Sequence, residues 1–317
     1  MRIANGEGKG NAMTDHGEHS SGRARSFAEL VQVLPKTGPS QEQISASKPY
    51  NPQSSDVIIT PFGKCGTTMM QQMFHQLRMA PHGGDMDFDD ISRVVPWIET
   101  APELELDINA EQRAKPRGFK SHLHYEGLPP GLRYVVTLRP PDEALVSLYH
   151  FFSGWFFDPG TISIEEFVPV WLWERPDRPN YYTHLLSWWA RRDTPDTLLT
   201  DYRAVLKNKR DAIRRLADFC DIAADQAAID LVENRTSRDF MMEHKAPFAD
   251  PMMRRMTFEK ANLPMDSDSA KIRAKDAERV PLPKSVFDQL DAIWAEQVEP
   301  VTGHSNYASL VAALTRD

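Results

Sequence analysis

Short apolar runs alternate along the chain with segments in which apolar residues recur at helical spacing. Four runs, Asp56–Thr60, Pro116–His122, Arg133–Leu138 and Asp196–Thr200, have the length and composition of strands. Arg133–Leu138 (RYVVTL) fits the strand pattern best. Apolar runs of this kind are typical of strands that are buried on both faces of a parallel sheet. The pattern therefore predicts a central, mostly parallel sheet.

Helical patterns follow these strands. Thr67–Met79 and Glu143–Phe152 carry apolar residues at helical spacing, and Arg210–Cys220 and Ser285–Val298 are amphipathic. A shorter helix is expected at Ser26–Leu34. Strands that alternate with helices indicate an α/β fold, so we expect a single domain in which helices flank the sheet.

The N-terminal part of the chain differs in composition from the rest. It is rich in Gly, Ser and charged residues, it lacks the apolar core of a signal peptide, and Pro35–Gln53 reads as irregular. We expect residues 1–45 to form a disordered tail and residues 46–317 to form the domain. The charged segment Pro81–Asp90 (PHGGDMDFDD) is interpreted as a solvated loop.

Composition and charge restrict the class of partner. The 317 residues are 41% hydrophobic and 26% charged, which is ordinary for a globular protein. A formal net charge of -8 provides no general field for nucleic acid, so no nucleic-acid partner is expected. No apolar run reaches the length of a membrane span, and Cys65 and Cys220 are too few for a disulfide framework. A cytoplasmic protein is expected, and its oligomeric state stays open.

The segment Gly63–Thr68 (GKCGTT) lies between the first strand and the first long helix. Glycines allow a tight turn whose N–H groups approach an anion, and a helix N-terminus adds roughly half a positive charge. Thr67 and Thr68 add hydroxyl donors. A nucleotide-triphosphate P-loop has its lysine directly after the second glycine, but here Lys64 comes before Gly66. The P-loop-like segment therefore suits one terminal phosphate, with Lys64 near its bridging oxygen.

Two further strands end in polar side chains, and ligands of open α/β sheets bind beyond the carboxyl ends of the strands. Lys120 and His122 end one strand. A neutral imidazole can accept a hydroxyl proton, so His122 is a candidate general base. Arg139 ends the next strand, where a kinase would place a metal-binding carboxylate, and Ser147 follows about two helical turns later. This pair predicts a second anion site and no metal.

The stretches KCGTT, FKSHL and LRPPDEALVSLYHF closely resemble, in the expected order, the three hallmark motifs of cytosolic-type sulfotransferases. The resemblance covers roughly residues 56–297. Members of this family transfer a sulfuryl group from 3′-phosphoadenosine-5′-phosphosulfate (PAPS) to an acceptor hydroxyl or amine. The resemblance implies PAPS as co-substrate, no metal, and a small-molecule acceptor.

The resemblance also implies roles for individual residues. Lys64, Cys65, Gly66, Thr67 and Thr68 match the loop that binds the 5′-phosphosulfate. The other matches are Lys120 for the second lysine, His122 for the catalytic base, Arg139 and Ser147 for the 3′-phosphate, and, more weakly, Tyr202 and Thr236 with Ser237 and Met241.

The chain departs from the family pattern at several of these positions. Cys65 replaces the loop serine, Met69 replaces the tryptophan that stacks on adenine, and Arg238 replaces a phenylalanine. Thioether and guanidinium contacts are therefore expected around the adenine. The glycine-containing C-terminal motif over the 3′-phosphate is represented only by KIRAKDAERVPL, with Arg273 as its nearest equivalent.

The hypothesis is an in-line sulfuryl transfer in which His122 deprotonates the acceptor and Lys64 and Lys120 neutralise developing charge. A small-molecule kinase with a degenerate P-loop would need a lysine after Gly66. A nucleotide-binding protein without catalysis would not need His122 or Lys64.

The acceptor is less well defined. The aromatic stretches PWIE (Pro96–Glu99), GWFF (Gly154–Phe157) and WLW (Trp171–Trp173) either line an apolar pocket or belong to the core. A small apolar alcohol or phenol is expected, while carbohydrate and lipid acceptors remain open.

Overall fold

A parallel sheet of four strands forms the centre of the computed structural model, which describes residues 22–174, 178–265, 271–272 and 280–314. The strand order is β2-β1-β3-β4, and every neighbouring pair is parallel. The strands are β1 (Val57–Ile59), β2 (Gly118–Lys120), β3 (Arg133–Leu138) and β4 (Thr197–Asp201). Each one overlaps a predicted strand, and the predicted α/β fold is confirmed.

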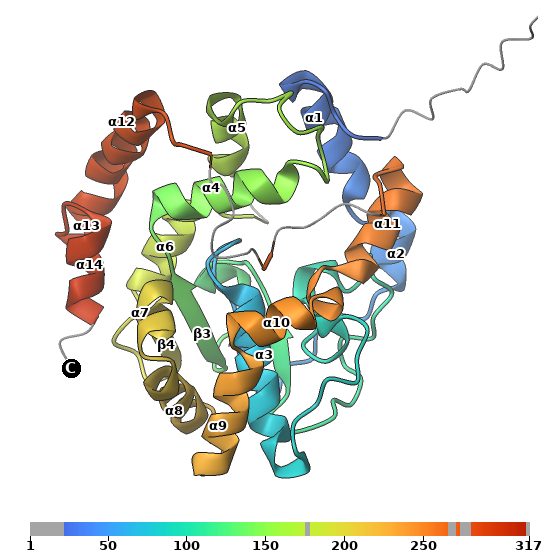
Figure 1. Cartoon of the computed structure of the whole chain (residues 1–317), viewed down its shortest axis with the longest axis vertical. Helices are drawn as coiled ribbons and strands as arrows, with labels where there is room; N and C mark the ends of the chain where they lie inside the picture. Colours follow the sequence, from blue (N-terminus) through green and yellow to red (C-terminus); the bar gives the residue numbers. More distant parts are fainter. Residues whose placement is uncertain (1–21, 175–177, 266–270, 273–279, 315–317) are drawn as a thin grey trace, which may run out of the picture.

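Helices pack on both faces of this sheet (Figure 1). On one face, Val57 and Ile59 of β1 share an apolar cluster with α3 (Thr67–Met79), α8 (Lys209–Phe219) and α9 (Gln226–Arg235). On the other face, Ile58 of β1 belongs to a larger cluster. That cluster draws on α4 (Pro141–Phe152), α5 (Ile164–Trp171), α6 (Tyr181–Trp189) and α12 (Lys284–Ile293). Alternation along β1 thus feeds two separate cores.

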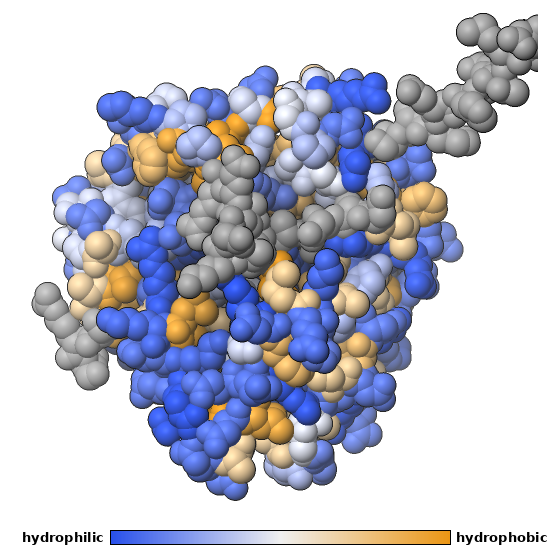
Figure 2. Space-filling view, viewed as in Figure 1, coloured by the Kyte–Doolittle hydropathy of each residue, from blue (hydrophilic) through white to orange (hydrophobic). Residues whose placement is uncertain are grey.

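The remaining helices surround these two layers. They are α1 (Phe27–Val33), α2 (Gln41–Ala46), α7 (Tyr202–Lys207), α10 (Arg238–Glu243), α11 (Pro251–Ala261), α13 (Glu299–Thr302) and α14 (Tyr307–Leu314). A π-helical turn at Trp294–Val298 continues α12. Over α8 and α9 the surface is largely hydrophilic (Figure 2), as expected of amphipathic helices whose apolar side faces the sheet. Within the described ranges, no helix combines the length and apolarity that crossing a bilayer requires.

The segment that precedes the first strand is more ordered than its composition indicates. Leu30 and Val33 of α1 are buried in the larger core. The prediction that Pro35–Gln53 is irregular is wrong at α2, where the backbone N–H of Ser40 donates to Gln43 Oε1 and the N–H of Gln43 donates to Ser40 Oγ. This reciprocal pair is a capping box, a helix signal within a polar segment. The domain boundary at residue 46 stays a prediction, although residues 22–46 supply core contacts.

The segment Pro81–Asp90 is also more than the solvated loop that was expected. Asp85 is buried and accepts hydrogen bonds from His75 Nε2 at 2.9 Å and from Arg113 Nη1 at 2.7 Å. Burial, followed by the positive charge of Arg78, lowers the pKa of His75 to about 4, so His75 is neutral near pH 7. A buried polar network therefore ties this segment to α3.

Candidate active site

The turn between β1 and α3 contains two residues with a left-handed backbone conformation. Lys64 and Gly66 have positive φ values of 69° and 94°. A Cβ atom at Gly66 would lie 2.5 Å from Cδ2 of Tyr202, so both the backbone conformation and the space require glycine here. Helix α3 then begins at Thr67. The sequence motif therefore sits in the strand, turn and helix context that it predicted.

Two threonines follow at the start of α3. Thr67 is buried, and its Oγ1 has no hydrogen-bond partner among the described residues. Thr68 is partly exposed beside it. A buried hydroxyl without a partner is uncommon in a folded protein, and one at a helix N-terminus is suited to an anion. The residues present thus fit a phosphate group at this turn.

Two lysines from neighbouring strand ends approach aromatic rings. Lys64 Nζ lies 4.4 Å from the ring centre of Phe151, and Lys120 Nζ lies 3.4 Å from that of Trp97. Burial, together with the positive charge of Lys271, lowers the pKa of both lysines to about 7. The positive charges of Lys271, Arg139 and Lys120 all lower the pKa of Lys64, so an added anion would relieve this repulsion.

A buried carboxylate partly offsets this positive charge. Asp250 has a φ of 55° and forms an ion pair with Lys271. Burial would raise the pKa of Asp250, but Lys271, Lys120 and Lys64 together lower it. Asp250 therefore stays ionised beside the two lysines and opposes the loss of their protons.

His122 is held by hydrogen bonds at its ring and its backbone. Nδ1 lies 2.7 Å from the carbonyl oxygen of Pro61, and the backbone N–H donates to Glu99 Oε1 at 2.6 Å. A carbonyl can only accept, so Nδ1 carries the proton and Nε2 of the neutral ring is left as a proton acceptor. Burial and the positive charge of Lys120 hold the pKa of His122 well below its ordinary value. The ring is therefore neutral near pH 7.

Arg139 reaches the turn between β1 and α3 from the end of β3. Its Nη1 donates to the carbonyl of Lys64 at 3.0 Å, and its Nε donates to Glu143 Oε2 at 3.1 Å. Glu143 also accepts from Arg203 Nη2 at 2.6 Å. Ser147 lies further along α4 and is partly exposed. A common phosphate for Arg139 and Ser147 stays a prediction.

The weaker sequence matches differ in how they relate to this turn. The Tyr202 ring packs against Gly66 and lies 5.4 Å from Arg139 Cζ. Met69 lies in α3 and is buried in the apolar cluster that α3 shares with α8 and α9. The hydroxyl of Thr236, the C-cap of α9, donates to the Val232 carbonyl at 2.7 Å. Their adenine contacts stay predictions, and Arg273 lies outside the described residues.

The sequence analysis named Trp97 and Glu99 only within a candidate pocket-lining stretch and did not predict that they contact the tip of β2. Glu99 accepts from the Ser121 hydroxyl at 3.0 Å as well as from His122. The Trp97 ring lies 5.1 Å from that of His122. Both residues belong to the stretch PWIE, whose aromatic residue was the available signal. Trp155 and Trp171, from the other two stretches, are buried in the core.

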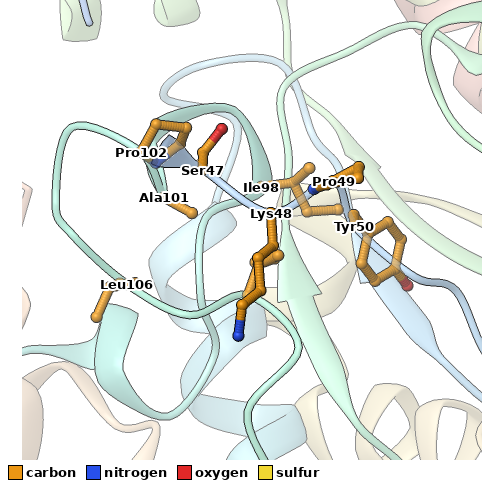
Figure 3. Close-up of a pocket in the computed structure, with 9 residues that line it drawn as sticks. Ser47, Lys48, Pro49, Tyr50, Ile98, Ala101, Pro102 and Leu106 are labelled. Atoms are coloured by element: carbon orange, nitrogen blue, oxygen red, sulfur yellow. The ribbon is translucent and has the colours of Figure 1, made fainter. Parts of the chain in front are cut away.

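A separate cavity of about 190 Å³ lies between the chain before β1 and the loop that follows Trp97. Figure 3 shows Tyr50, Ile98 and Pro102 among its walls, with the amine of Lys48 pointing away from Ser47. Its lining residues are Ser47, Lys48, Pro49, Tyr50, Ile98, Ala101, Pro102, Leu106 and Ile108. These do not include the site residues predicted from sequence.

Comparison with known proteins defines the class. The model of the sulfotransferase domain matches residues 54–275, well over half of the chain, so the chain belongs to this family. Human sulfotransferase 1C2 is 26% identical over 247 residues, which cover 74% of this chain and 79% of that protein. The luciferin sulfotransferase of Photinus pyralis is 26% identical over 226 residues, which cover 61% of this chain and 58% of that protein.

Solved structures show the same fold. Mouse sulfotransferase SULT7A1 complexed with PAP has a TM-score of 0.59 at 17% identity, covering 83% of this chain and 91% of that one. Retinol dehydratase in complex with androsterone and the inactive cofactor PAP has a TM-score of 0.56 at 16% identity, with 92% and 94% covered. Family and fold together identify a PAPS-dependent sulfotransferase. The alternative of a kinase with a degenerate P-loop is not favoured.

Proposed function

We propose that this enzyme sulfates the hydroxyl group of a small, apolar acceptor and that His122 is its general base. The hydrogen bond from His122 Nδ1 to the Pro61 carbonyl carries this proposal. It leaves Nε2 unprotonated, and the low pKa of the ring keeps it so at neutral pH. A general base needs both an open lone pair and a fixed direction.

The proposed step is a direct transfer of the sulfuryl group to the acceptor oxygen. The acceptor O–H bond breaks and its proton moves to His122 Nε2, while a bond forms between the acceptor oxygen and sulfur. The bond from sulfur to the 5′-phosphate oxygen breaks, and its electron pair stays on that oxygen. Lys64, at the turn, and Lys120, at the end of β2, neutralise the charge that develops there. Because these lysines supply the positive charge, the proposal requires no metal.

The apolar character of the acceptor is proposed from the surroundings of His122. The Trp97 indole lies edge-on to the imidazole and carries the Lys120 amine over its face. An aromatic wall of this kind favours a flat or apolar alcohol over a highly hydrated sugar. One relative is named for luciferin, and one structural neighbour was solved with androsterone and with retinol, which are compounds of this apolar kind. We also propose a cytoplasmic location and no nucleic-acid partner, given the net charge of -8.

The test is a screen of phenols, steroid alcohols, aliphatic alcohols, amines and sugars with ³⁵S-labelled PAPS, followed by a variant. His122→Ala should lower kcat by roughly 10²–10⁴-fold, because a general base contributes about that much to rate. His124→Ala, a partly exposed histidine two residues along the chain, is the matched control. Affinity for PAP should change little in either variant. If His122→Ala retains wild-type turnover, His122 is not the base.

A further inference from the structure

One carboxylate holds the catalytic end of β2 in place. Glu99 lies in the 3-10 turn Ile98–Thr100, and its Oε1 accepts two hydrogen bonds from consecutive residues. The donors are the Ser121 hydroxyl at 3.0 Å and the His122 backbone N–H at 2.6 Å. One oxygen atom therefore fixes both the chain and a side chain next to the imidazole.

The segment that carries Glu99 contacts all three residues at this strand end. The backbone N–H of Lys120 donates to the Pro96 carbonyl at 2.7 Å, and the Lys120 amine lies over Trp97. The Ser121 hydroxyl in turn accepts from the Leu123 N–H at 3.0 Å, which extends the network beyond His122. With the ring bound to Pro61 on its other side, His122 is held at two points.

Burying the carboxylate of Glu99 costs free energy. Burial raises the pKa of Glu99, although hydrogen bonds from the backbones of His122 and Glu99 and from the side chains of Ser121 and Trp97 oppose the rise. The second oxygen, Oε2, is buried with no hydrogen-bond partner among the described residues. A buried carboxylate oxygen without a partner carries a desolvation cost. Positioning of the base is a function that would account for its presence.

We propose that Glu99 is a positioning residue for this reaction: its Oε1 holds the backbone of His122 so that Nδ1 meets Pro61 and Nε2 faces the acceptor. The proposal rests on the proposed role of His122 as general base. Glu99 acts through His122 and through geometry, so the reach of its side chain matters more than its charge.

Three substitutions separate reach from charge. Glu99→Gln keeps an acceptor oxygen at the same reach and loses the charge, whereas Glu99→Asp keeps the charge and is shorter by one methylene. Glu99→Ala loses both. Glu103→Gln is the matched control, because Glu103 is a buried carboxylate four residues along the same loop, and its Oε2 also has no partner among the described residues.

The first measurement needs no acceptor. ¹⁵N NMR of histidine-labelled protein at pH 7 reports which ring nitrogen carries the proton, and the His122→Ala spectrum assigns the signals of His122. Wild type, Glu99→Gln and Glu103→Gln should show His122 only as the Nδ1–H tautomer. Glu99→Asp and Glu99→Ala should show a mixture of tautomers.

The second measurement is turnover of PAPS with 2-naphthol as a probe acceptor. Glu99→Asp and Glu99→Ala should lower kcat by about 10–100-fold, since misplacing a catalytic group by an ångström costs on the order of 10²-fold. Calorimetry should show PAP affinity unchanged. Adding Glu99→Ala to His122→Ala should cause no further loss, because the residue acts through His122.

Three results would overturn the proposal. The first is a single Nδ1–H tautomer of His122 in folded Glu99→Ala and Glu99→Asp. The second is a larger loss of kcat in Glu99→Gln than in Glu99→Asp. The third is a loss of kcat in Glu103→Gln equal to that in Glu99→Ala. If 2-naphthol is not turned over, or Glu99→Ala does not fold, the tautomers of Glu99→Asp and Glu99→Gln decide the question. An active His122→Ala enzyme would instead refute the proposed base and leave the tautomer result standing.

Discussion

Nucleotide binding should draw protons from solution above neutral pH. Lys64 and Lys120 each have a pKa of about 7 in the free enzyme, lowered by burial and by Lys271. A lowered lysine pKa means that the charge is present below pH 7 and lost as the pH rises above it. A bound phosphate favours the charged form and so restores the protons.

The size of this effect follows from the two pKa values. At pH 8 a lysine with a pKa of 7 is about 90% neutral, so binding PAP should take up about 1.8 protons. If only the fully protonated site binds, affinity should fall about 30-fold between pH 7 and pH 8. Asp250, which faces both lysines, stays ionised over this range and contributes no proton.

Calorimetry of PAP binding in buffers of different ionisation enthalpy measures this uptake directly. Lys64→Met and Lys120→Met should each reduce the uptake by about half. Lys284→Met, an exposed lysine paired with Asp288, should leave it unchanged. Binding at pH 8 without proton uptake would show that the lysines are already charged in the free enzyme, and the explanation by burial would be wrong.

Three further outcomes are expected. In EDTA the wild type should bind 3′,5′-bisphosphorylated adenosine more tightly than AMP by on the order of 10²–10⁴-fold. Arg139→Ala should reduce this preference, because hydrogen bonds to the second phosphate are lost. An unchanged affinity ratio by calorimetry would show that Arg139 does not bind the second phosphate. Cys65→Ser should leave turnover nearly intact, since burial raises the pKa of the thiol to about 12 and keeps it protonated; an inactive enzyme would contradict this. Asp56→Ala should lower the free energy of unfolding by about 3–5 kcal/mol, since it leaves buried Arg117 without its carboxylate; urea denaturation with a loss below 1 kcal/mol would contradict it.

The convergence of the site could be predicted because it depends on the parallel direction of the strands. Lys64 follows β1, Lys120 is the last residue of β2 and Arg139 follows β3, and these three strands lie side by side in the sheet. Carboxyl ends of adjacent parallel strands meet at one edge. Sequence periodicity locates such strands, so the residues directly after them could be named in advance.

The residues that orient these groups could not be predicted in the same way. Glu99 and Asp250 lie in a 3-10 turn and just before α11, in segments without a repeating apolar pattern. Their partners, His122 and Lys271, lie 23 and 21 residues away along the chain. Charge pairs of this kind depend on loop conformation, which short-range patterns do not specify. Helix α2 was missed for another reason, because its capping residues lie in a polar segment.

The pairing of β1 with β2 sets the spacing between the turn that carries Lys64 and the strand end that carries His122. Ile59 pairs with Lys120, so the turn that carries Lys64 and the tip that carries His122 leave the sheet at one level. A slip of one residue would move the tip by about 3.3 Å and turn its side chains to the opposite face. The register of the sheet thus fixes the distance between the turn and the strand end. Variants that loosen β2 should therefore displace both Lys120 and His122 from the turn, even when every catalytic residue is intact.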